Sequence, residues 1–153
     1  MPIKLKTPLK DIRLHVQELT ENARNAIVSV LTDVGLQCVI EARESSGYTD
    51  QTGNLRSSIG FVVVKDGKIV EKILADQVGD NKPSTQEGMS NANETLERLA
   101  SKYSSGICLI VVAGMNYAAY VEGRGRNVLT SSELLAERII PKMLTDLGVE
   151  IKK

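Results

Sequence analysis

The chain has 153 residues, 42% of them hydrophobic and 25% charged, which is ordinary composition for one globular domain that buries roughly 70% of its unfolded surface. Lys plus Arg and Asp plus Glu each number 19, so no net field draws the protein to nucleic acid or to an anionic membrane. With one Phe, four Tyr and no Trp, the core must consist mainly of Val, Ile, Leu and Ala.

The first ten residues lack the apolar region of a signal peptide, and no apolar run approaches the ~20 residues of a membrane span. We therefore expect synthesis and residence in the cytoplasm, with no membrane partner. The two cysteines, Cys38 and Cys108, fall in apolar patterns without a CxxC spacing. Both are expected to be buried free thiols.

A long amphipathic helix is predicted after a flexible arm at residues 1–8, with Pro8 in the first helical turn. Apolar residues recur there at steps of three and four. They are Leu9, Ile12, Val16, Leu19, Ala23, Ile27, Val30 and Val34. Because Gly costs about 1 kcal/mol inside a helix, a break or kink is expected at Gly35, and the helix should end near residues 44–47. A stripe this long needs the sheet, or a neighbouring subunit, to cover it.

After a polar loop, the middle of the chain predicts a β-hairpin. Strands at 58–64 and 69–75 flank the dipeptide Asp66-Gly67, which tolerates the positive φ angles of a two-residue type I′ turn. The expected cross-strand pairs are Val63 with Val70, Phe61 with Lys72, and Ile59 with Leu74. A helix over 69–74 also fits the apolar spacing and is the less favoured alternative.

The segment that follows the hairpin is predicted to be a mobile surface loop, residues 76–90, and then a short inserted helix. Asn91 and Glu94 have the spacing of a capping box, and the apolar positions behind them predict a helix at 91–104.

Residues 107–113 are apolar at both odd and even positions, so we expect a strand buried on both faces in the middle of the sheet. The last helix is predicted at 131–147, kinked or split at Pro141, and a loose tail at 148–153. The chain has no internal repeat and no domain boundary. The expected fold is a single α+β domain, with a small, mostly antiparallel sheet packed against a long N-terminal helix and a C-terminal helix.

The sequence shows no catalytic constellation. His15 is the only histidine and has no evident catalytic partner, so it is interpreted as structural. The carboxylates are scattered without a diagnostic metal-ligand spacing and are interpreted as solvated acids. They are Asp33, Glu41, Glu44, Asp50, Asp66 and Glu122. Gly123-Arg124-Gly125-Arg126 is favoured as a flexible loop over a phosphate site, and Lys65 and Lys68 as solubilising charges.

Two short stretches carry a family resemblance. Residues 50–59, DQTGNLRSSI, resemble the TG-x-L-R-x-S-I stretch of the tail-completion (head–tail joining, or neck) proteins of long-tailed bacteriophages. Residues 116–123, NYAAYVEG, resemble the Y-A-x-Y-V-E-x-G stretch of the same family. The order of the predicted elements agrees as well. The chain departs from the family in the Gly123-Arg124-Gly125 run after the second motif and in its long connection at 76–106.

The positions that match the family's motifs, together with neighbouring positions that the resemblance implies as possible assembly contacts, form one set. They are Thr52, Gly53, Leu55, Arg56, Ser57, Ile59, Tyr117, Ala118, Tyr120, Val121, Glu122, Gly123, Arg124 and Arg126. Gly53 would permit a tight turn, and Leu55 and Ile59 would anchor the strand start. Arg56 and Glu122 are candidates for a salt bridge between the motifs, while Tyr117 and Tyr120 would lay their rings on the sheet with their hydroxyls in water.

The resemblance implies a structural virion component with no enzyme activity, cofactor or metal. It would form a ring of identical subunits, expected to be a hexamer, and contact tail-tube and neck or connector proteins. It would be found in the host cytoplasm during assembly and then in the virion. The alternative is a small hydrolase or nuclease that holds a metal with Asp50 and Glu122. A nucleic-acid-binding accessory protein is disfavoured by the zero net charge and the lack of an aromatic platform.

Overall fold

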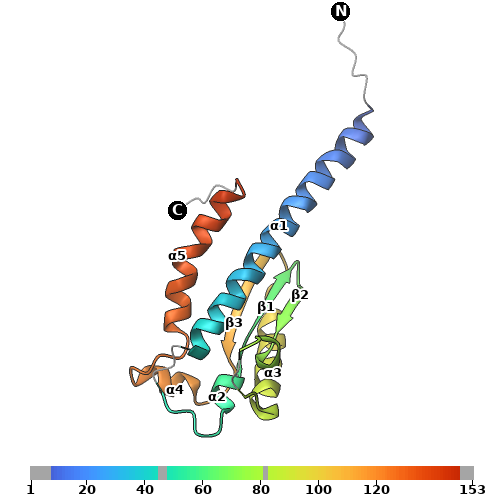
Figure 1. Cartoon of the computed structure of the whole chain (residues 1–153). Helices are drawn as coiled ribbons and strands as arrows, with labels where there is room; N and C mark the ends of the chain where they lie inside the picture. Colours follow the sequence, from blue (N-terminus) through green and yellow to red (C-terminus); the bar gives the residue numbers. More distant parts are fainter. Residues whose placement is uncertain (1–7, 45–47, 81–82, 149–153) are drawn as a thin grey trace, which may run out of the picture.

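The computed structural model describes residues 8–44, 48–80 and 83–148. It has the predicted α+β architecture, with a long N-terminal helix, a three-stranded sheet and a C-terminal helix (Figure 1). The sheet lies between the N-terminal helix and a helix from the middle of the chain. The elements are α1 (Leu9–Glu44), α2 (Asn54–Ser57), β1 (Ile59–Lys65), β2 (Lys68–Ile73), η1 (Ala75–Gln77), α3 (Gln86–Ala100), β3 (Ile107–Ala113), α4 (Ala118–Gly123) and α5 (Thr130–Asp146). The predicted arm and tail lie almost entirely outside the described residues.

The sheet is antiparallel throughout, with the strand order β2-β1-β3. The prediction that residues 107–113 form the central strand is therefore wrong, because β1 is central and β3 lies at an edge. Both faces of β3 are nevertheless partly covered, since α1 packs on one side of the sheet and α3 on the other. Coverage of the two faces makes a strand apolar at every position, whether or not a neighbour pairs with each of its edges.

The hairpin is confirmed, and its turn residues Asp66 and Gly67 have φ angles of 51° and 81°, as a type I′ turn requires. The predicted register is wrong beyond the turn. Val64 pairs with Ile69, but Val63 pairs with Glu71 and Phe61 with Ile73. One extra residue on β2 produces this shift, which is a β-bulge, and a bulge leaves no clear mark in the hydrophobic pattern.

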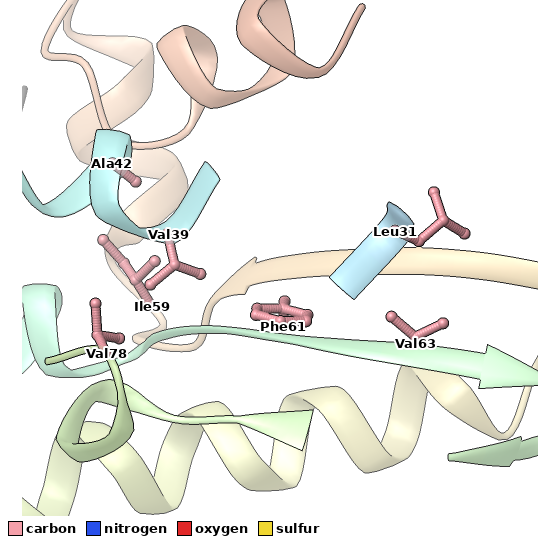
Figure 2. Close-up of a cluster of buried hydrophobic side chains, with 7 residues drawn as sticks. All are labelled: Leu31, Val39, Ala42, Ile59, Phe61, Val63 and Val78. Atoms are coloured by element: carbon pink, nitrogen blue, oxygen red, sulfur yellow. The ribbon is translucent and has the colours of Figure 1, made fainter. Parts of the chain in front are cut away.

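Helix α1 runs unbroken through Gly35, so the predicted break is not observed. The glycine serves packing instead. A Cβ atom at position 35 would lie 2.5 Å from the Phe61 ring, which means that the only phenylalanine fits against the bare backbone of the helix. Figure 2 shows Phe61 in a buried cluster with its neighbours from β1 and α1. The cluster comprises Leu31, Val39, Ala42, Ile59, Phe61, Val63 and Val78.

The other helices differ from prediction at their ends. Helix α3 begins at Gln86 rather than residue 91, because Thr85 is its N-cap and accepts a hydrogen bond from the Gly88 N–H at 3.2 Å. Helix α5 continues past Pro141, so the predicted split does not occur. Its packing against α1 holds it on one side, while Pro141 itself is exposed. Pro8 precedes α1, and its carbonyl accepts hydrogen bonds from Asp11 N and Ile12 N.

The two halves of α1 have different surroundings (Figure 1). The C-terminal half packs on β1, β3 and α5, and Val34 and Cys38 are buried there. The N-terminal half projects beyond the sheet, and Leu9, Val16 and Leu19 are each more than half exposed. By length and composition alone α1 is long and apolar enough to cross a membrane, and 39% of its most apolar part is buried in the domain. Core helices of soluble proteins and signal sequences share this length and composition.

The two cysteines are free thiols, with Cys38 buried and Cys108 half-buried. Desolvation raises the pKa of both thiols, aided at Cys38 by the charge of Glu41 and opposed at Cys108 by a hydrogen bond with the Val64 backbone. The Cys38 thiol donates to the Ser132 carbonyl at 3.5 Å, and the Ser132 hydroxyl donates to the Cys38 carbonyl at 2.6 Å. These contacts give Cys38 a structural role between α1 and α5.

Candidate functional site

The two motif stretches, some sixty positions apart in sequence, meet at one end of the domain, where α2 and α4 lie near each other (Figure 1). Leu55 from the first motif, Ala118 from the second and Val128 form a small buried cluster, with Val121 packed against it. We call these four residues the motif junction. A cavity of about 240 Å³ beside it is lined by both motifs, including Thr52, Leu55 and Tyr117.

Asp50 shapes the turn of the first motif. Its carboxylate accepts hydrogen bonds from Gly53 N at 3.1 Å and from Arg56 N at 2.8 Å. Gly53 has a φ of 77°, a conformation that residues with a side chain adopt rarely. The turn predicted for Gly53 is thus present, and the Asp50 carboxylate satisfies backbone donors at the start of α2.

Ser57 and Asn54 join the first motif to α3. The buried Ser57 hydroxyl accepts a hydrogen bond from Thr85 N at 2.9 Å, and the Thr85 hydroxyl donates to Asn54 Oδ1 at 2.6 Å. Gly88 allows the two helices to approach closely, since a Cβ there would lie 2.5 Å from the Asn54 carbonyl. Ile59, the last motif residue, is buried in the main core as predicted. The first motif is therefore built into the fold except at Gln51 and Thr52, which are exposed.

Glu122 caps the start of α5. Its carboxylate accepts hydrogen bonds from the N–H groups of Val128 at 2.7 Å, Leu129 at 2.8 Å and Thr130 at 3.1 Å, and from the Thr130 hydroxyl. Burial raises the pKa of this carboxyl, but the hydrogen bonds, that of the Thr130 hydroxyl foremost, outweigh it and hold the pKa below its ordinary value. A negative charge at a helix N-terminus is also favoured by the helix dipole.

The predicted salt bridge between Arg56 and Glu122 is absent from the ion pairs of the described residues. Glu122 faces the α5 N-terminus, whereas the Arg56 guanidinium lies over the Tyr48 ring at 5.8 Å. The Tyr48 hydroxyl is buried, with no hydrogen-bond partner in the described part of the chain. Burial, together with the Asp50 charge, raises the pKa of Tyr48 to about 12.

Arg43 and Asp80 form an ion pair that sequence reasoning missed. Arg43 is fully buried, and its Nε and Nη2 donate to the two Asp80 carboxylate oxygens at 2.7 and 3.0 Å. Its Nη1 donates to the Arg56 carbonyl at 2.8 Å. This pair fastens one point of the 76–90 segment to the end of α1 and to the first motif. No local pattern marks Arg43, which occupies a helix position where a surface arginine is just as common.

The two motif tyrosines differ from each other. Tyr120 is 62% exposed, with the Arg124 guanidinium 4.7 Å from its ring centroid, so the prediction that its ring lies on the sheet is wrong. Tyr117 is 37% exposed, and its pKa is raised by burial and by the Asp50 charge, against a hydrogen bond with the Thr52 side chain. Tyr120, Gly123, Arg124 and Arg126 are all exposed, and we call them the motif surface.

The carboxylates considered for metal chemistry are used by the fold. Asp50 caps α2 and Glu122 caps α5. Among residues 8–44, 48–80 and 83–148, no group of three or more His, Cys, Asp or Glu side chains is placed to hold a metal ion. His15 is exposed on the projecting half of α1.

Comparisons of the chain with models of protein families, with curated proteins and with solved structures found no match.

Proposed function

We propose that this protein is a structural, non-enzymatic virion component that completes the tail or joins head to tail in a long-tailed bacteriophage or prophage. It would act at the neck or at the head-proximal end of the tail, as a ring of identical subunits that contacts tail-tube and connector proteins. The host cytoplasm would be its place of assembly. The proposal rests on the resemblance of the two motifs.

The observation that supports this proposal best is the meeting of the two motifs. Leu55 of one packs with Ala118 and Val121 of the other, and Glu122 caps the helix that follows. Two short stretches that serve one junction are expected to be retained together, which makes their joint occurrence more informative than either stretch alone. Their carboxylates bind backbone N–H groups, a use that favours a structural role over a metal-dependent hydrolase.

The motif surface is where we expect contacts with other subunits or tail proteins. The stacked pair Tyr120 and Arg124 offers an aromatic ring and a guanidinium to a partner. These two residue types are enriched at the energetic centres of interfaces. The long segment at 76–90 is the second expected contact region, and its mobility stays a prediction.

Mass spectrometry of purified particles tests the proposal. Particles from an induced host strain would be separated on a density gradient and searched for peptides of this protein. We expect a few to a dozen copies per particle, together with tail proteins. Absence from well-formed particles that contain their tail proteins would overturn the structural assignment.

A charge reversal tests the motif surface within the same system. We expect Arg124→Glu combined with Arg126→Glu to lower the yield of complete particles while the monomer stays folded. The matched control is Arg98→Glu with Lys102→Glu, two exposed basic residues at the end of α3. Unchanged particle assembly in the Arg124 and Arg126 variant would remove this surface from the proposal.

A further inference from the structure

Two apolar surfaces of the chain have no partner within the described residues. The first is the stripe on the projecting part of α1, Leu9, Ile12, Val16 and Leu19, which we call the tip stripe. Three of these side chains are more than half exposed. Across residues 8–44, 48–80 and 83–148, no hydrogen bond or salt bridge joins residues 9–20 to any element other than α1 and the preceding Pro8. The first contacts of this kind along α1 are made by Glu21 with Lys65 and by Arg24 with Asp66.

The second surface is a groove of about 540 Å³ between α1, β3 and α5. Leu31 of α1 forms one wall, Leu109 and Val111 of β3 the floor, and Ile140 and Leu144 of α5 the other wall. In Figure 1 the two helices lie close together near the start of α5 and diverge toward its C-terminal end. We call this opening the helix groove.

The two surfaces match in length. The tip from Leu9 to Thr20 and the α5 wall from Glu133 to Leu144 both span about 17 Å at the rise of an α-helix. Both are apolar, one is a projecting ridge and the other a hollow. The tip cannot enter the groove of its own chain, because α1 is one continuous helix and its C-terminal half is itself a wall of that groove. Only the tip of a second copy can do so.

The charges are also complementary. At 3.6 residues per turn, Arg13 and His15 lie on either side of the tip stripe, and the acidic residues Glu18 and Glu21 fall on the opposite face. Among the described residues that line the groove, Glu133 is the only charged one. A tip that enters from the open end brings its N-terminal part, with Arg13, deepest toward Glu133. Neither side chain takes part in a salt bridge within the described part of the chain.

The area of the contact is modest. Half the side surface of a helix 17 Å long is roughly 400 Å², so one tip in one groove would bury about 800 Å² in total, below the ~1,200 Å² of a standard stable interface. Two copies alone should therefore associate weakly. In a closed ring every subunit makes the contact twice, once with its tip and once with its groove, which raises the overall stability without any new contact.

We propose that the tip stripe of one copy docks in the helix groove of the next copy, head to tail. This inference rests on the self-assembly in the proposed function, for which it names the contact, but it does not require a place in the virion. The geometry of one tip and one groove on each subunit is heterologous, and such contacts close into rings when the rotation between neighbours permits.

The test uses the purified full chain and sedimentation velocity over a range of protein concentrations. We expect the wild type to shift from monomer to larger species as its concentration rises. Leu19→Glu on the tip and Leu144→Glu in the groove should each raise the concentration needed for this shift on the order of tenfold or more. Leu14→Glu is the matched control, because Leu14 is as exposed as Leu19 (53% and 55%) but lies on the far side of the helix.

Mixing the two variants gives the decisive reading. Leu19→Glu retains an intact groove and Leu144→Glu an intact tip, so the mixture should form heterodimers and nothing larger. Because the heterodimer makes one contact only, it should form at concentrations above those at which the wild type assembles. A mixture that stays monomeric at those higher concentrations overturns the proposal, as does a wild type that is monomeric at every concentration. Normal assembly of Leu144→Glu, with loss of assembly in Leu19→Glu, would assign the tip to pairing with another tip.

A second pair of variants keeps the test valid if Leu144→Glu fails to fold, which circular dichroism would show. Arg13→Glu and Glu133→Arg should each weaken assembly, and the double variant should regain it. No recovery in the double variant would count against the docking. Particle mass spectrometry distinguishes the docking contact from the proposed role in the virion. If the protein assembles through tip and groove but is absent from particles, the contact is supported and the virion role is overturned.

Discussion

The two halves of α1 share one apolar repeat but have opposite surroundings. At Val34 the stripe is covered by the domain, while at Val16 and Leu19 the same spacing faces solvent. Apolar periodicity therefore specifies that a helix forms and which side it will bury, but not what covers that side. An isolated helical segment of about twelve residues is marginal in water. The projecting half must rely on its continuity with the packed half, or on a partner.

The largest expected effect tests the packed half at its end. Arg43→Ala would leave the Asp80 carboxylate without its buried partner and remove a hydrogen bond to the Arg56 carbonyl. Breaking a buried pair from one side costs about 3–5 kcal/mol of unfolding free energy. Urea denaturation would measure it. Arg13→Ala on the projecting half is the control, and at concentrations where the protein is monomeric it should stay within about 0.5 kcal/mol of the wild type. Equal losses of unfolding free energy in Arg43→Ala and Arg13→Ala would contradict the difference between the packed and projecting halves of α1.

Leu31→Ala comes next and tests the core packing of the packed half of α1. Leu31 is 7% exposed and belongs to the main core cluster, so its truncation leaves a cavity. We expect a loss of about 2–4 kcal/mol, again from urea denaturation. A loss below about 1 kcal/mol would mean that the groove beside Leu31 collapses easily around the missing atoms.

Glu122→Gln should cost about 1–2 kcal/mol at neutral pH, because a neutral amide replaces a charged cap at the α5 N-terminus. The pKa of Glu122 is depressed in the folded state, so its contribution is fully present above the ordinary value of 4.5 and is lost as pH falls below it. Thermal melts from neutral to acidic pH should therefore converge for wild type and variant at the acidic end. A constant difference across that range would show that the charge of Glu122 contributes nothing.

The smallest effect is expected at Leu19→Ala. At concentrations where the protein is monomeric, the change should shift the unfolding free energy by less than about 0.5 kcal/mol, since the side chain contacts little and Ala is a strong helix former. The contrast with Leu31→Ala compares the same substitution on the two halves of the same helix. A loss above about 1.5 kcal/mol in the monomer would mean that the tip packs on its own domain in solution.

The sequence predicted the fold where the signal was local. The repeat from Leu9 to Val34 gave α1, and Asp66-Gly67 gave the hairpin and its turn type. Predictions failed where the cause lay far away in the chain. The sequence indicates a helix break at Gly35, because no local pattern shows that Phe61 packs against this glycine in the fold. The extra residue that shifts the hairpin register has no signature of its own either.

The candidate site divides in the same way. Gly53, Leu55 and Ile59 behave as their residue types suggest, at a turn and in the core. Glu122 was assigned the wrong partner, because its target is a run of backbone N–H groups that exists only once α5 has formed beside it. The ion pair between Arg43 and Asp80 is not predictable from the sequence, because two charged residues at distant positions have the same local pattern whether they are buried together or exposed.

The contact between Phe61 and Gly35 also fixes how α1 is rotated about its long axis. A side chain at position 35 would overlap the Phe61 ring, so either the ring would have to move or the helix would have to rotate or lift away from the sheet. Leu19 lies about 24 Å along the helix from that point, and Leu9 about 39 Å. A tilt of α1 at this contact would displace the distant end by an amount that grows with this distance, so Gly35 also sets the direction in which the projecting half of α1 points.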